Sequence, residues 1–159
     1  MRTQPNNQIS RKGLTVWRWY GLFQFLFLIL VAIGVYFILD RTEADWKFNF
    51  ISLAVLLLHI IFFMILFPKV RWMRWRYEVR EAEIELQHGL FIVKRTLIPM
   101  IRVQHVDTTQ GPLLRKYNLA VLTISTAATV HAIPAIAVEE ADALRQQISV
   151  LARVAKEDV

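Results

Sequence analysis

The chain has 159 residues, enough for one domain of modest size, and 55% of them are hydrophobic, a high share for a soluble protein. The formal net charge is +6, but the basic residues flank hydrophobic segments and no recognised nucleic-acid motif is present, so the charge favours an anionic membrane surface over nucleic acid as a partner. The sequence has no cysteine, which excludes disulfides and cysteine-based metal or nucleophile sites.

Two apolar runs, residues 20–39 and 48–67, predict a hairpin of membrane-spanning helices. The first contains no charged residue and has about the length that crosses a bilayer core as a helix. It is too long for the apolar part of a signal peptide, and no small-residue cleavage pattern follows it, so both runs are expected to be retained. All five tryptophans lie just outside the runs, as in an aromatic belt at a membrane interface: Trp17, Trp19, Trp46, Trp72 and Trp75.

Basic residues gather on the side of the hairpin that carries both termini. The flanking set is Arg2, Arg11, Lys12, Arg18, Lys69, Arg71, Arg74 and Arg76. The loop of residues 40–47 has only Arg41 and Lys47, so the positive-inside rule places the loop outside and both termini in the cytoplasm. The expected division is a cytoplasmic tail (1–19), a multi-pass hairpin in the cell membrane (20–67) and a cytosolic domain (68–159).

Gln24 and His59 are the polar residues that stand out inside the spans. An antiparallel register leaves them about one helical turn apart. A histidine that hydrogen-bonds across the hairpin or to another subunit is favoured over a proton relay, because a relay needs a chain of partners. The same register places Gly34 level with Ser52 and Ala54, which predicts close approach of the helices near the outer face.

Beyond Pro68 the sequence changes to short alternating runs, which predict six strands: 75–80, 83–88, 90–98, 101–110, 119–126 and 129–136. The short connections favour an antiparallel meander over parallel βαβ units. A shift in the apolar phase at Val106 predicts a β-bulge. The segment Leu113–Tyr117 predicts one helical turn, which Asn118 would end in the left-handed conformation.

From Val138 onward the apolar residues follow helical spacing. The predicted buried face consists of Val138, Ala141, Leu144, Ile148, Leu151 and Val154. This amphipathic helix would cover an open end of the sheet. The expected fold class is therefore α+β, with a transmembrane hairpin followed by a curved antiparallel sheet or barrel and a closing C-terminal helix.

The order of short motifs in this half also indicates a family. The motifs are Trp75 with Tyr77, Gly89, Ile98-Pro99, Arg102-Val103, Gln110-Gly111, Leu113-Leu114-Arg115, Asn118-Leu119-Ala120, and Ala141 with Leu144. Together with the hairpin they resemble the second type of bacterial pleckstrin-homology (PH)-like domain, found in small membrane proteins. Family members often have glycine at position 118 and a glycine after the Thr-Ala of the next hairpin, where this chain reads Thr126-Ala127-Ala128-Thr129.

The resemblance implies a seven-stranded domain. Six strands are visible, and a seventh requires one long run to break, for example at Val106. The resemblance also implies a partner, a larger membrane protein with more domains of this type, and a role of the pair in the cell envelope. PH domains that bind phosphoinositides have a basic first hairpin, whereas this chain reads Arg80-Glu81-Ala82-Glu83, so no headgroup site is assigned.

Residues for catalysis are sparse. His105 and Asp107 share one face of a strand, a spacing that permits an acid–base pair, but His88 and His131 are isolated. No HExxH-type spacing and no glycine-rich phosphate loop is present, so no catalytic, cofactor-binding or metal-binding residue is expected.

The remaining candidates are Arg102, Arg115 and Lys116, which are expected to be exposed and to face a partner or lipid headgroups. The favoured function is a non-catalytic, membrane-anchored interaction module with a hetero- or homo-oligomeric protein partner. A sensor of anionic lipid or envelope stress is the alternative. A membrane-bound enzyme is a third class, without a supporting constellation of residues.

Overall fold

The computed structural model describes residues 4–42 and 47–157, so Arg2 and Trp46 lie outside the described residues. The chain divides into two compact units. The hairpin unit is Trp17–Lys69, and the sheet unit combines the N-terminal segment up to Val16 with the chain from Val70 onward.

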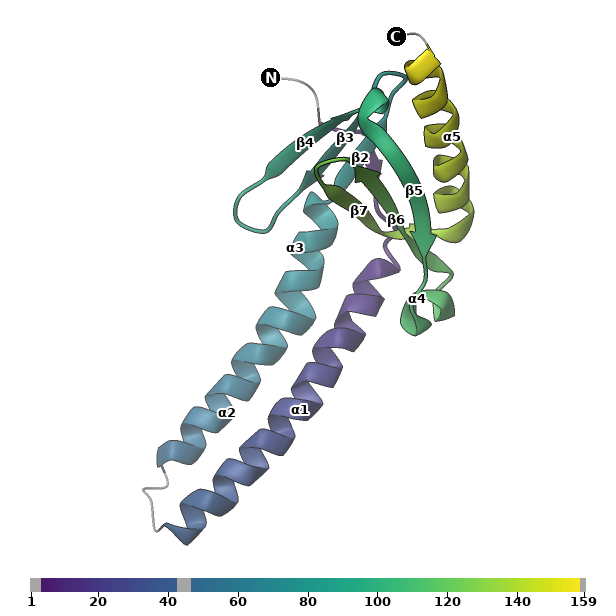
Figure 1. Ribbon diagram of the computed structural model, residues 1–159. Helices are drawn as coiled ribbons and strands as arrows, with labels where there is room; N and C mark the ends of the chain where they lie inside the picture. The colour runs from purple at the N-terminus through teal and green to yellow at the C-terminus, as the bar shows by residue number, and fades with distance from the viewer. Residues whose placement is uncertain (1–3, 43–46, 158–159) are drawn as a thin grey trace. The chain divides into compact units, whose positions relative to one another are not determined.

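The hairpin unit is formed by two long helices (Figure 1). The first is α1 (Gly13–Arg41), and the second runs through α2 (Lys47–His59), a π-helical segment η1 (Ile60–Leu66) and α3 (Phe67–Arg74). The most apolar 18-residue stretch of the first helix has a mean hydropathy of 2.7, and 0% of it is buried. The corresponding stretch of the second helix has a mean hydropathy of 2.9, and 6% of it is buried. An apolar surface this exposed on all sides needs lipid around it, unlike the core helix of a soluble protein. The two predicted spans therefore correspond to two candidate membrane-spanning helices.

The close approach of the two helices occurs at Gly21. A Cβ atom there would lie 3.1 Å from the Phe63 carbonyl oxygen, whereas one on Gly34 would meet nothing within 4 Å. The prediction of close approach at Gly34 is therefore wrong. Bulky side chains such as Phe37 and Leu53 line a gap of about 440 Å³ at that level, so the small residues do not decide the spacing there.

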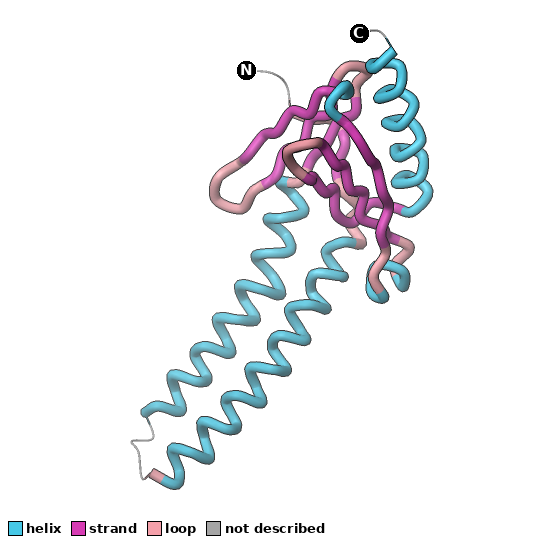
Figure 2. Tube along the Cα trace, in the orientation of Figure 1, coloured by secondary structure: helices cyan, strands magenta, loops and turns pink. Residues whose placement is uncertain are grey.

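All strands among the described residues belong to the sheet unit, and every pair is antiparallel (Figure 2). One sheet has the order β1-β2-β3-β4: β1 (Asn7–Gln8), β2 (Arg76–Val79), β3 (Glu83–His88) and β4 (Lys94–Pro99). The other has the order β5-β6-β7: β5 (Val103–Thr109), β6 (Leu119–Thr126) and β7 (Val130–Ala137). A 3₁₀ turn, η2 (Met100–Arg102), leads from β4 into β5, α4 (Pro112–Lys116) follows β5, and α5 (Val138–Glu157) ends the described chain.

The seventh strand comes from the N-terminal segment, not from a break in a long run. Asn7 pairs with Tyr77 and Gln8 with Arg76, so the sheet unit is discontinuous in sequence, with the hairpin inserted between β1 and β2. A second set of contacts supports this pairing, because the Trp72 indole N–H donates to the Ile9 carbonyl at 3.1 Å and the Gln8 amide donates to the Trp72 carbonyl at 2.9 Å. Two residues of strand are too few to show an alternating pattern.

Several local predictions are confirmed and others are corrected. Asn118 is left-handed (φ 55°), as predicted. The bulge lies earlier than predicted, between Val103 and His105, while Val106 pairs regularly with Ile124. The run predicted as strand 90–98 becomes strand only at Lys94, and strand 101–110 only at Val103.

The core of the sheet unit lies between the sheets and α5, which contacts η2, β5, β6 and β7. Its fully buried large side chains include Tyr77, Ile84, Leu86, Met100, Leu119, Leu122, Ile124, Ile133, Ile136 and Ile148. Tyr77 donates a hydrogen bond from its hydroxyl to Glu140 of α5, and burial raises the pKa of Tyr77. This bond ties β2 to the closing helix.

Two residues differ from the predicted burial pattern. Val154 is 48% exposed, because six residues at 3.6 per turn rotate it about 120° away from the buried Ile148. Trp75 is only 7% exposed and stacks on His88 with ring centroids 5.1 Å apart. Trp75 is therefore a core residue of the sheet unit, and its assignment to the aromatic belt is wrong.

Candidate functional site

A groove of about 460 Å³ opens where β4 and η2 approach the β6–β7 hairpin, and we call it the sheet-edge groove. It is lined by Leu97, Ile98, Pro99, Ile101, Arg102, Gln104, Thr126, Ala127, Ala128, Thr129, His131 and Lys156. Among the described strands β4 pairs with β3 alone, so the groove lies beside an edge strand.

The β6–β7 hairpin forms one wall of the sheet-edge groove, and its turn contains no glycine. The Thr126 hydroxyl accepts a hydrogen bond from the Thr129 amide at 3.0 Å, and the Thr126 amide donates to the Thr129 carbonyl at 2.9 Å. The Thr129 hydroxyl also lies 2.8 Å from Nε2 of His131. These bonds explain how the chain closes the hairpin at the position where family members often have glycine.

The η2 turn forms the opposite wall of the sheet-edge groove and determines which side chains line that wall. Because residues 100–102 leave the strand, Met100 turns into the core and Ile101 is 43% exposed, although Ile101 alternates with the polar Arg102 in the sequence. Leu97 of β4 is also 43% exposed. Arg102 and Lys156 add positive charge, and among the described residues no carboxylate lines the groove. The groove thus offers apolar walls and two cations.

The three predicted partner-facing cations are all exposed but do not form one group. Arg102 ends η2, directly before β5, and lines the sheet-edge groove, whereas Arg115 and Lys116 lie on α4, after the end of β5. A seven-residue strand spans about 20 Å, so the structure separates Arg102 from the other two. Thr126–Thr129 and Lys156 were not predicted as site residues, because they meet the other groove residues only through folding.

The two polar residues inside the hairpin, Gln24 and His59, line one groove but differ in exposure. His59 is buried, and its Nε2 atom lies 3.2 Å from the Gly21 carbonyl oxygen. A carbonyl oxygen only accepts, so Nε2 carries the proton and donates. The imidazole stacks on Phe63 with centroids 4.8 Å apart. Gln24 is exposed on the hairpin surface and shares a shallow apolar groove of about 500 Å³ with His59.

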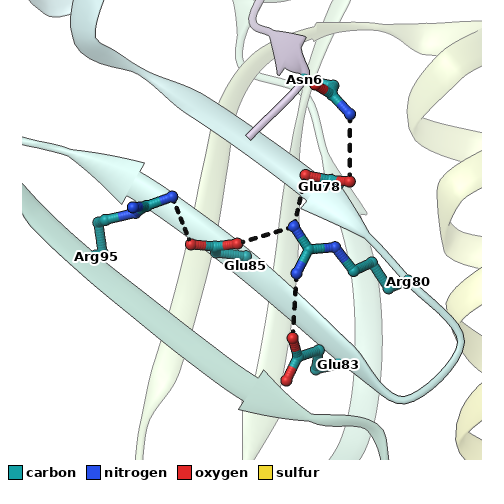
Figure 3. Close-up of polar contacts among 6 residues, drawn as sticks. All are labelled: Asn6, Glu78, Arg80, Glu83, Glu85 and Arg95. Atoms are coloured by element: carbon teal, nitrogen blue, oxygen red, sulfur yellow. Dashed lines mark hydrogen bonds and ion pairs between the residues drawn. The ribbon is translucent and has the colours of Figure 1, made fainter. Parts of the chain in front are cut away.

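The first hairpin of the chain's second half carries a network of ion pairs (Figure 3). Arg80 contacts Glu78 at 2.9 Å and both Glu83 and Glu85 at 3.2 Å, and Arg95 contacts Glu85 at 2.9 Å. The hydrogen bond from Arg80 lowers the pKa of Glu78. Glu85 is only 4% exposed, so its charge needs these two guanidinium groups. The Arg80 charge is matched by carboxylates, which leaves this hairpin poorly suited to an anionic headgroup.

The candidate acid–base pair His105 and Asp107 lies on the surface of a strand. His105 and Asp107 are both exposed on β5, opposite Ser125 and Thr123 of β6. Within residues 4–42 and 47–157, no group of three or more His, Asp or Glu side chains is arranged to hold a metal ion.

Comparisons with known proteins agree with this architecture. The family model described as "Bacterial PH domain" matches residues 20–152. The UPF0699 transmembrane protein YdbS of Bacillus subtilis (strain 168) is 52% identical over 159 residues, covering 100% of both chains. The UPF0699 transmembrane protein YdbT of the same strain is 25% identical over 124 residues, which is 76% of this chain but 24% of YdbT. No solved structure matches. With its two apolar helices and its two antiparallel sheets packed against a C-terminal helix, the chain belongs to the bacterial PH domain family and is a YdbS-like transmembrane protein.

Proposed function

We propose that the protein is a non-catalytic, membrane-anchored interaction module whose sheet-edge groove binds a protein partner at the inner face of the cell membrane. The groove is the observation that carries this proposal, because it combines exposed apolar walls with two cations beside an edge strand. Such an edge favours an extended peptide that adds main-chain hydrogen bonds, while the pockets beside it select side chains. Arg102 and Lys156 would favour a segment with an acidic residue.

The proposed partner is a larger YdbT-type membrane protein, with which the protein would act in cell-envelope maintenance or defence. Support comes from the similarity itself, since YdbT matches 76% of this chain within only 24% of its own length and therefore contains much additional sequence. The exposed amide of Gln24 adds support inside the membrane, because an amide that faces lipid gains a hydrogen bond when a partner helix packs against it.

The orientation with both termini in the cytoplasm is part of the proposal and is tested separately. A reporter that is active only in the cytosol should work when fused after Val159, and a reporter that is active only outside should work in the loop of residues 40–47. The physical reason for this orientation is the excess of Lys and Arg next to the span ends that lead to the two termini. Reversed signals would place the sheet unit outside and refute a partner at the inner face.

The groove is tested by removing its two cations in the full-length protein. We expect the double variant Arg102→Ala/Lys156→Ala to recover at least about tenfold less tagged YdbT-type protein from solubilised membranes, since losing charged contacts at an interface costs more than about 1.4 kcal/mol. The matched control is Arg115→Ala/Lys116→Ala, which removes the same charge from α4. Its recovery should stay close to that of the unchanged protein.

Equal losses in the two double variants would indicate that only net charge matters, and unchanged recovery in the groove variant would refute the groove as the binding site. Melting temperatures of both variants in detergent verify that folding is intact, because exposed charges removed elsewhere change stability by no more than about 0.5 kcal/mol.

A sensor of anionic lipid is the second candidate, favoured by the exposed Arg115 and Lys116 on α4. Each cation near an anionic leaflet gains about 1 kcal/mol. Under this alternative, the α4 variant and not the groove variant should lose the contact of the sheet unit with anionic headgroups in nanodiscs that hold the full-length protein.

A further inference from the structure

The loop between β3 and β4 exposes three consecutive large apolar side chains, Phe91, Ile92 and Val93, which we call the apolar tip. Phe91 is 85% exposed and Ile92 83%, more than any other large apolar side chain in the described part of the chain, the spanning helices included. Figure 1 shows this loop projecting from the β3–β4 hairpin. Exposed contiguous apolar groups next to a membrane protein's sheet indicate a surface that another phase or molecule covers.

The loop has a defined conformation that presents these side chains outward. Gly89 has φ +136°, and a Cβ atom there would lie 1.9 Å from the Ile92 carbonyl oxygen, so the loop turns back sharply on Gly89. The Arg74 guanidinium donates to the Phe91 carbonyl at 3.4 Å. At the base of the loop His88 pairs with Lys94. The turn at Gly89, the strand pairing at the base of the loop and the hydrogen bond from Arg74 therefore fix the loop backbone, and the apolar side chains remain exposed.

The hydrogen bond from Arg74 links the tip to the segment that follows the second apolar run in the chain. Arg74 ends α3, seven residues after Phe67, the last residue of the apolar run. Seven helical residues rise only about 10 Å. The tip is thus bonded to a residue that follows the second apolar run closely in the chain.

The charges around the tip fit an anionic interface. Residues 88–97 and 68–77 contain no Asp or Glu, while Lys94 directly follows the tip and Arg74 contacts it. An apolar patch with a basic border is the arrangement by which peripheral segments enter the boundary between headgroups and acyl chains.

We propose that the apolar tip inserts into the leaflet from which the second span emerges, with Lys94 and Arg74 among anionic phospholipid headgroups. The tip is then a third membrane contact beside the two spans. Because the spans already anchor the chain, its effect is to restrict the orientation of the sheet unit on the membrane surface.

The absence of cysteine allows a direct test in the full-length protein. Ile92→Cys and, as matched control, Val150→Cys replace exposed apolar residues, and each is labelled with an environment-sensitive fluorophore in nanodiscs with anionic or only zwitterionic phospholipid. Val150 is 59% exposed on α5. We expect a blue-shifted label at position 92 that is quenched by nitroxide-bearing lipid and protected from iodide, and a water-exposed label at position 150. The position-92 effects should be larger in the anionic nanodiscs.

The outcomes separate the two parts of the proposal. Equal iodide quenching at both positions in anionic nanodiscs would overturn insertion. Protection at position 92 that is the same in both nanodiscs would overturn the role of anionic headgroups, and protection that arises only after membrane extract is added would assign the tip to a protein. Phe91→Cys repeats the measurement if the Ile92 variant fails to fold.

Discussion

Replacing Leu144 by alanine should lower the free energy of unfolding by about 2–5 kcal/mol. Leu144 is buried at 9% exposure on α5, the helix that closes the core by packing on η2, β5, β6 and β7. The loss combines the apolar transfer free energy of the removed atoms with the cavity that remains. For a domain of this size, the melting temperature of the sheet unit in detergent should fall by at least about 8 °C.

The same helix supplies the control. Val150 is 59% exposed, and Val150→Ala should change stability by no more than about 0.5 kcal/mol. If Leu144→Ala and Val150→Ala melted at the same temperature, α5 would not be docked as the structure shows.

Gly89→Ala should destabilise the β3–β4 hairpin by about 1–3 kcal/mol from backbone conformation alone, because φ +136° is accessible almost only to glycine. The added Cβ would also meet the Ile92 carbonyl oxygen at 1.9 Å, so the loop must rearrange. Hydrogen exchange at the amides of residues 93–96 should become faster, and the melting temperature should fall.

Gly111→Ala is the matched substitution for Gly89→Ala. Gly111 has ordinary extended backbone angles (φ −79°, ψ 170°), and a Cβ there meets nothing within 4 Å. Hydrogen exchange and the melting temperature of the Gly111→Ala variant should therefore equal those of the unchanged protein. Equal behaviour of the two variants would show that the tight turn at Gly89 is not maintained in solution.

The elements predicted correctly are those whose signal lies within a few consecutive residues. The two spans follow from uninterrupted apolar composition, and β3 and β6 have the predicted bounds because alternation persists along each strand. The period of 3.6 identified α5, and Asn118 marked the end of α4 because asparagine tolerates the left-handed conformation. The order of these motifs also indicated the family that the comparisons show.

Errors arose where a turn interrupts a sequence that has the composition or the alternation of a strand. Residues 90–93 have the apolar composition of a strand, but the turn at Gly89 leaves Phe91 and Ile92 exposed. Ile101 alternates with Arg102 in sequence, yet Met100 occupies the core and forces Ile101 outward in the 3₁₀ turn.

By itself, the sequence determined the membrane hairpin, the antiparallel strands with their closing helix, and the cations Arg102, Arg115 and Lys116 as exposed groups. Only the tertiary structure decided that Asn7 and Gln8 complete a sheet, that His59 bonds to the Gly21 carbonyl, and that Arg102 shares a groove with Lys156. The apolar composition of a segment and the spacing of its apolar residues can be recognised within that segment alone. Strand pairing, the close approach of helices and grooves depend on contacts between residues far apart in the sequence, and these contacts form when the core packs.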